Sequence, residues 1–313
     1  SQSICIFVVH AETLAAGCGP APSLEHGGES GRYLVVGLLM SGVIILCALP
    51  TPTQREPIAK RNTFLGDIRT VARRAIRSLS REPEFIGPAL AIPVFFFVVN
   101  IGALEAFVER QPGIDYRAFQ LPVAIIFAVT GISRANMLVT DIQTGYLDRM
   151  LVTPIRRVSL LLGLMIADIV LAFALATIVL FLGFAVGVSF GTGVTGLLVF
   201  VVLSMAWSLT FTGFPYTIAL RTGNPAAVNS AFLIFFPFAF LTPSFLPREL
   251  MSGWLKTVAA WNPVTYLLEG MRSVLSDGWE FDLLLKAVAA IVGLGLVTFT
   301  MAFRALSRRV ATG

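Results

Sequence analysis

Residues 160–186 read LLLGLMIADIVLAFALATIVLFLGFAV, a run in which Asp168 is the one charged side chain. A helix must continue for about 20 apolar residues to cross a hydrocarbon core of roughly 30 Å. A helix also satisfies its own backbone hydrogen bonds where water is absent. The run therefore predicts a membrane-spanning helix.

The composition of the whole chain agrees with a membrane protein. Its 313 residues are 56% hydrophobic and 13% charged, and the mean hydropathy is +0.82. About a quarter of the residues of a soluble domain carry charge, so lipid must cover most of this surface. We predict an all-α membrane protein with six transmembrane helices, near residues 84–104, 118–139, 160–186, 194–220, 227–246 and 281–304.

Basic residues alternate between the two sides of these predicted helices. They gather before the first helix, between the second and third, after the fourth and after the sixth. Loops rich in Lys and Arg stay in the cytoplasm. We therefore expect both ends of the six-helix core to be cytoplasmic. The net charge of +5 then reflects topology, and we expect a lipid bilayer and no nucleic acid as partner.

The first 50 residues differ in kind from the rest. All cysteines and histidines precede residue 48, and Cys5, Cys18 and Cys47 are too far apart for a metal or redox motif. Residues 33–49 are either a poorly ordered hydrophobic leader or one extra membrane helix. The predicted organisation is an atypical extension at 1–50, a linker and a cytoplasmic amphipathic helix at 51–83, and a six-helix domain at 84–313.

Residues 65–81 have apolar side chains at helical spacing along one face and arginines at every fourth position along another. Such a helix is expected to lie flat on the inner leaflet with its apolar side toward lipid. Pro83 ends it, because proline lacks the amide hydrogen that would extend the helix. The arginines of this ridge are Arg69, Arg73, Arg77 and Arg81.

Charged residues are sparse inside the predicted spans, and two of them bear on the function. Arg134 is near the inner end of the second span, and Asp168 lies about two turns into the third. A carboxylate near the centre of a membrane costs about 2.5–3.5 kcal/mol. The two residues form a structural pair, Asp168 contacts a substrate, or Asp168 relays protons in a proton-coupled secondary transporter.

Residues 145–157 read GYLDRMLVTPIRR, a charged and proline-broken segment between the second and third spans. Its place in the topology makes it cytoplasmic, where a partner protein can dock. The chain has no Gly-Lys dipeptide and therefore no Walker A loop for nucleotide phosphates. We expect no catalytic residues, no metal site and no ATP hydrolysis on this chain.

The order of these features resembles the type-2 ABC exporter permeases, most closely the daunorubicin-resistance-like drug exporter permeases. Residues 145–154 are similar to a coupling-helix pattern, Gly-Thr-Leu-Glu-Arg-Leu-x-x-Thr-Pro, in which Tyr146 and Asp148 replace Thr and Glu. The resemblance implies that the coupling contact to an ATPase is made by Gly145, Leu147, Asp148, Arg149, Met150, Thr153 and Pro154.

An apolar, proline-divided segment after the fifth span adds to the resemblance. It predicts short helices that re-enter or lie on the outer leaflet, with Trp254, Trp261 and Tyr266 at the level of the headgroups. The resemblance implies an external gate segment that includes Pro243, Pro247, Asn262, Pro263, Tyr266 and Arg272.

The resemblance also implies partners and a function. Two permease copies, identical or closely paralogous, would each sit on a separate ATP-binding subunit that holds the ATP and Mg, with no cofactor on the permease. Leu147 and Met150 would be buried in that subunit, and Asp148 and Arg149 would fix the contact by charge. The expected function is export of an amphipathic drug, antibiotic or lipid-like molecule across a bacterial plasma membrane. Export of a polysaccharide or lipid-linked glycan is the alternative.

Overall fold

The computed structural model describes residues 63–79, 83–108, 115–131, 133–152, 157–248 and 251–312. These residues belong to one compact unit, Ala59–Gly313, and contain helices and no strand. The predictions for residues 1–62 lie outside the described residues. The elements are α2 (Phe64–Leu79), α3 (Pro83–Val108), α4 (Tyr116–Thr130), α5 (Ala135–Gln143), α6 (Tyr146–Val152), α7 (Arg157–Ala185), α8 (Gly193–Thr222), α9 (Pro225–Phe240), α10 (Gly253–Trp261), α11 (Pro263–Arg272), the π-helical turn η3 (Ser273–Asp277) and α12 (Phe281–Thr312).

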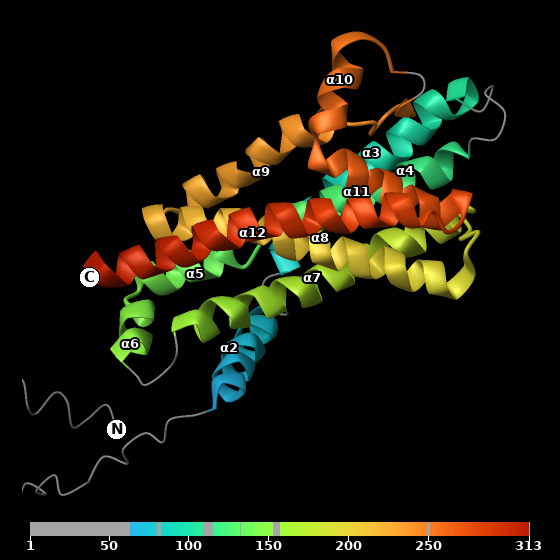
Figure 1. Cartoon of the computed structure of the whole chain (residues 1–313). Coiled ribbons are helices and arrows are strands. Elements are labelled where there is room, and N and C mark those ends of the chain that lie inside the picture. The colour runs from blue at the N-terminus through green and yellow to red at the C-terminus, as the bar shows by residue number, and fades with distance from the viewer. Residues whose placement is uncertain are drawn as a thin grey trace, which may run out of the picture. The chain divides into compact units, whose positions relative to one another are not determined.

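Five helical segments in the described residues are long and apolar enough to cross a membrane: α3, α4 with α5, α7, α8 and α12. The prediction of an all-α, multi-pass membrane protein is confirmed. The last of these helices runs past the predicted end at residue 304 to Thr312. Figure 1 shows α12 in red, with α5, α6 and the C-terminus at one end of the bundle.

The predicted fifth span is shorter than expected. Its helix, α9, has 16 residues and ends at Phe240, so the prediction that it continues to Leu246 was wrong. At 1.5 Å per residue it is about 24 Å long, less than a hydrocarbon core. The helix ends because the hydroxyls of Thr242 and Ser244 both bond to the carbonyl of Ala239, at 2.6 and 2.7 Å, and Pro243 has no amide hydrogen to continue the ladder.

The predicted second span is divided. Helix α4 ends at Thr130 and α5 begins at Ala135, so this span contains a break where the sequence predicted a continuous helix. The apolar composition of the segment concealed the break, because hydropathy reports burial and not backbone continuity.

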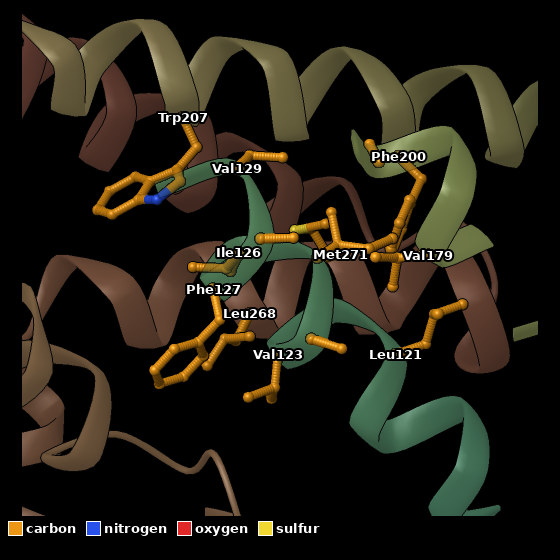
Figure 2. Packing of buried hydrophobic residues seen from close by; sticks show 14 of the residues in the cluster. Leu121, Val123, Ile126, Phe127, Val129, Val179, Phe200, Trp207, Leu268 and Met271 are labelled. Atoms are coloured by element: carbon orange, nitrogen blue, oxygen red, sulfur yellow. The ribbon is translucent and has the colours of Figure 1, made fainter. Parts of the chain in front are cut away.

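Helix α8 lies at the centre of the bundle and packs on α12, α7, α9, α4 and α5. Around it, a cluster of buried apolar side chains joins α4, α7, α8 and α11. Figure 2 shows Leu121, Ile126 and Phe127 of α4 in this cluster, with Trp207 of α8 and Met271 of α11. These contacts hold α4 in the bundle, and α5 and α6 follow it in the chain.

The apolar face of α2 packs on α7. Its buried residues include Ile68, Val71 and Ala75, and a Cβ added at Gly163 of α7 would lie 2.6 Å from the Cβ of Val71. The expectation that the apolar face of this helix rests on the inner leaflet is therefore corrected. Its apolar face was assigned to lipid because the sequence does not distinguish a lipid surface from an apolar helix surface.

Candidate functional site

Helix α6 follows α5 through a tight turn at Gly145. The φ angle of Gly145 is +67°, a left-handed conformation that glycine adopts without the steric cost that a Cβ brings. The turn lets two short helices meet at an angle, and it places α6 at the same end of the bundle as the C-terminus (Figure 1).

The side chains of α6 divide between the protein's own core and its surface. Leu147 is 1% exposed and packs among buried side chains of α5, α7 and α8. Met150 packs against the same cluster and is half-buried. The expectation that Leu147 is buried in a partner is therefore corrected, because its side chain already lies inside this protein. Asp148 and Arg149 are exposed, so they remain available to a partner.

A partly buried ion pair joins α2 to the end of α5, next to α6. The guanidinium of Arg74 donates to both carboxylate oxygens of Asp141, at 2.9 and 2.5 Å. The same guanidinium lies over the ring of Tyr146, 4.1 Å from its centroid. The hydrogen bond to Asp141 raises the pKa of Arg74 above its usual value. One arginine of α2 thus contacts both α5 and α6.

Neither Arg74 nor Asp141 was predicted as a site residue. Arg74 follows Arg73 of the ridge, and the sequence does not distinguish it from the other arginines of this helix. Asp141 gave the better signal, because it is a lone acid at the end of an apolar run. The acid is nearly fully buried in the structure, and a buried carboxylate requires a partner.

The arginine ridge of α2 is exposed at Arg69, Arg73 and Arg77. Arg81 lies outside the described residues, as do Thr153 and Pro154. The ridge and the exposed pair on α6 lie on helices that Arg74 joins, because its guanidinium lies over Tyr146 of α6. Their contact with an ATPase stays a prediction.

A groove of about 400 Å³ opens beside the break between α4 and α5. Apolar side chains of α3, α8 and α9 form most of its walls, and polar side chains next to the break form the remainder. The amide nitrogen of Asn136 donates to Asn229 at 2.8 Å. The amide oxygen of Asn136 is buried and has no hydrogen-bond partner among the described residues. The lining includes Pro88, Ile92, Phe127, Thr130, Ser133, Arg134, Asn136, Pro215, Asn229 and Phe232.

Asp168 and Arg134 do meet, but through the backbone of Arg134. The carboxylate of Asp168 accepts from the Arg134 amide at 2.6 Å and from the Tyr216 hydroxyl at 2.6 Å. The Arg134 guanidinium donates to the hydroxyl of Ser78, at 3.2 Å. Asp168 is 1% exposed and is absent from the described residues that line the groove. This arrangement favours the structural reading over a substrate contact.

The predicted external segment is built as short helices, α10 and α11, as the sequence indicated. Asn262 joins two of the elements there. Its amide nitrogen donates to the carbonyls of Phe238 and Leu241, at 2.6 and 3.3 Å, while its oxygen caps α11 by accepting from Val264 at 3.0 Å. The end of α9 and the start of α11 are therefore held by one side chain.

The remaining residues of this segment have structural contacts. Pro243 and Pro247 are buried, and Pro263 occupies the first turn of α11. The Tyr266 hydroxyl donates to the carbonyl of Ala260 at 2.6 Å. Arg272 donates to the carbonyl of Phe119 at 3.2 Å and lies over its ring. Trp254 and Trp261 are exposed, as residues at the headgroup level would be.

Comparison with known proteins gives a consistent result. A family model described as ABC-2 type transporter matches residues 66–276. The chain is 26% identical over 219 residues to a probable doxorubicin resistance ABC transporter permease protein of Mycobacterium tuberculosis (strain CDC 1551 / Oshkosh), which covers 69% of this chain and 79% of the relative.

Two other relatives have similar descriptions. A daunorubicin resistance ABC transporter permease protein of Streptomyces coeruleorubidus is 26% identical over 232 residues, which cover 70% of this chain and 79% of the relative. A probable multidrug ABC transporter permease of Escherichia coli (strain K12) is 24% identical over 208 residues, covering 64% of this chain and 55% of the relative. These matches confirm the resemblance that the motifs indicated.

Proposed function

Since the chain belongs to the ABC-2 type transporter family, we propose that it is the permease subunit of an exporter driven by a separate ATP-binding subunit. The cargo is an amphipathic drug, antibiotic or lipid-like molecule, moved out across a bacterial plasma membrane. ATP and Mg are held by the partner, and two permease copies form the path.

The observation that carries the proposal is the division of α6. Leu147 anchors this helix in the permease, while Asp148 and Arg149 point to solvent beside it. A helix anchored on one side and charged on the other can transmit a push from a docked partner, because it cannot rotate freely. The Arg74 contacts to Asp141 and Tyr146 pass the same displacement to α2.

The groove supports an amphipathic cargo. Most of its lining is apolar, and Ser133, Asn136 and Asn229 are polar residues among the lining. Small-molecule sites usually combine apolar walls with a few placed polar groups. Such a lining suits an amphipathic ring system better than a polysaccharide, whose many hydroxyls need many partners. The relatives' names include doxorubicin and daunorubicin resistance, which makes doxorubicin a suitable probe.

The alternative of a proton-coupled transporter centred on Asp168 finds less support. Its carboxylate oxygens accept hydrogen bonds from Arg134 and Tyr216, and the acid does not border the groove. A proton relay needs a chain of exchangeable groups that leads to water. Dependence of transport on ATP, measured with the proton gradient collapsed, separates the two classes.

The coupling role is tested by changing Asp148 and Arg149 together to Ala. With the ATP-binding subunit present in inside-out vesicles, we expect ATP-dependent doxorubicin uptake to fall by about tenfold or more, because hydrogen bonds to charged groups contribute about 1.5–3 kcal/mol each. The unliganded permease should keep its thermal stability, since both side chains are exposed.

A matched control is the exposed pair Asp282 and Lys286 on α12, which lies 2.5 Å apart. Changing both to Ala removes the same charges far from α6 and should leave uptake intact. Unchanged uptake in the Asp148→Ala, Arg149→Ala variant would show that α6 is not the coupling element.

A further inference from the structure

A buried carboxylate accepts hydrogen bonds at the break in the second span. Asp168 of α7 accepts from the backbone amide of Arg134, at 2.6 Å, and lies 3.5 Å from the hydroxyl of Ser133. Ser133 in turn accepts from the amide of Ala135, at 3.2 Å. Backbone amides freed by a helix break need such acceptors, because no water is present in a membrane interior.

The side chain of Arg134 does not cap α5 itself. Asp168 accepts from the amide of the N-cap residue itself. In a capping box that amide is satisfied by the side chain at N3, which is Met137 in α5. The second oxygen of Asp168 accepts from the hydroxyl of Tyr216 on α8, at 2.6 Å. The break is thus attached to α7 and α8, and the Arg134 guanidinium attaches it to Ser78 of α2.

The groove lies against the same break. Thr130 and Gly131 line it from the α4 side, and Asn136 and Met137 line it from the α5 side. A change in the angle between α4 and α5 therefore moves one wall of the groove relative to the other. Because α5 leads directly into α6 through Gly145, the break is the joint between α6 and the groove.

We infer that Asp168 is a positioning residue that holds the second span in its bent form, and that through this bend a displacement of α6 alters the groove. The second part rests on the proposed function, whereas the first does not. Burying an apolar residue at this position of α7 would cost less free energy, because a buried carboxylate is unfavourable unless its oxygens are all hydrogen-bonded. The hydrogen bonds that Asp168 accepts at the break account for an acid at this position.

The first experiment measures the bend without any partner. Spin labels are placed at Thr144→Cys, after α5, and at Phe107→Cys, near the end of α3, in a chain whose Cys5, Cys18 and Cys47 are replaced by Ser. Thr144 and Phe107 are both exposed, so labels disturb little. The distance distribution in nanodiscs is compared for the parent chain and for Asp168→Leu, Asp168→Asn and Tyr216→Phe.

We expect a narrow distribution in the parent chain and a shifted or broadened one in Asp168→Leu, which has no acceptor. Loss of a hydrogen bond to a charged group should lower the ratio of bent to other forms by about tenfold. Asp168→Asn keeps one acceptor and should be intermediate. Thr177→Val is the matched control, because Thr177 is a polar residue of α7 that bonds within its own helix, to the carbonyl of Phe173.

The second experiment measures doxorubicin moved per ATP hydrolysed, with the ATP-binding subunit present. Asp168→Leu should lower this ratio by about tenfold while ATP hydrolysis continues, and Thr177→Val should not. If the parent chain itself moves no doxorubicin, the proposed function fails for this probe. The first experiment still tests whether Asp168 holds the second span in its bent form.

The first part of the inference is overturned if both Asp168 variants keep the parent distance distribution. The second part is overturned if they change this distribution while the transport ratio stays the same. Should the Asp168 variants not fold, Tyr216→Phe decides, because it keeps the carboxylate and removes one donor. A smaller change in the same direction supports the inference, and parental behaviour in both experiments assigns Asp168 to folding alone.

Discussion

Arg74 shows what one residue contributes to the end of the protein where α6 lies. Its bidentate contact with Asp141 and its position over Tyr146 use the planar guanidinium, which lysine cannot imitate. The neighbouring Arg73 is exposed and belongs to the ridge. The two adjacent arginines are therefore different in kind, one joining helices and the other facing outward.

We predict that Arg74→Ala lowers the free energy of unfolding by about 1–2 kcal/mol. The expected loss is in the lower part of the range for charged hydrogen bonds, because Arg74 is partly exposed and solvent screens the pair. Arg74→Lys should restore only part of this. Thermal unfolding in detergent measures the change, and Arg73→Ala is the control.

A double variant separates the pair from its surroundings. Arg74→Ala leaves Asp141 buried without its cation, so adding Asp141→Asn should recover part of the lost stability. Additive losses in the double variant would mean that the ion pair does not couple α2 to α5.

Helix α6 shows how an element of two turns is held in place. Isolated helices of this length are unstable in water, so its stability comes from contacts at Leu147, at Met150 and at Tyr146. Its exposed charges are carried on a helix that the permease itself orders. A partner then meets a formed surface and does not have to order the helix on binding.

We predict that Leu147→Ala destabilises the permease alone by about 2–4 kcal/mol, because it leaves a cavity in a closed apolar cluster. Asp148→Ala should change the stability of the permease by less than about 0.5 kcal/mol, as exposed substitutions usually do. Thermal unfolding without the ATP-binding subunit distinguishes the two. If both variants are equally stable, Leu147 is not buried in the permease and faces a partner instead.

On the scale of the whole molecule, the groove depends on helices that are distant in the chain. Its walls come from α3, from α4 and α5, from α8 and from α9, and α8 packs on most of the others. No short segment contains it. A displacement of any of these helices therefore alters the shape of the groove.

We predict that Ile92→Trp, which fills the groove from α3, lowers ATP-dependent doxorubicin uptake by about tenfold while ATP hydrolysis remains. Overpacking an existing space forces side chains out of low-energy positions. Val292→Trp is the control, since Val292 is similarly exposed on α12 and does not line the groove. Uptake measured in inside-out vesicles should be unaffected by the control. Normal uptake in Ile92→Trp would exclude the groove from the path.

Much of the fold was predictable from local sequence. Hydropathy identified α3, α7, α8 and α12, and proline positions indicated the short helices α10 and α11. The end of α9 was misjudged, because the hydroxyls of Thr242 and Ser244 and the carbonyl of Ala239 end the helix inside an apolar run. Hydropathy averages over such details.

The candidate site was predictable in position and only partly in detail. The motif from Gly145 to Pro154 led to α6, yet it assigned Leu147 to a partner. Burial of a leucine is expected from its chemistry, but the surface that buries it depends on how α5 turns at Gly145 and on which helices lie near. Arg74 and Asp141 are separated by 67 positions, so no local pattern joins them.

The sequence by itself determined that this protein is helical, that it spans a membrane several times and that it belongs with the ABC-2 type transporters, because composition and motif order are local properties. Only the tertiary structure decided where the second span breaks, which side of α6 is free and what Asp168 holds. The Arg134 amide and the Asp168 carboxylate lie 34 positions apart in the chain, and they meet because α5 and α7 both pack on α8.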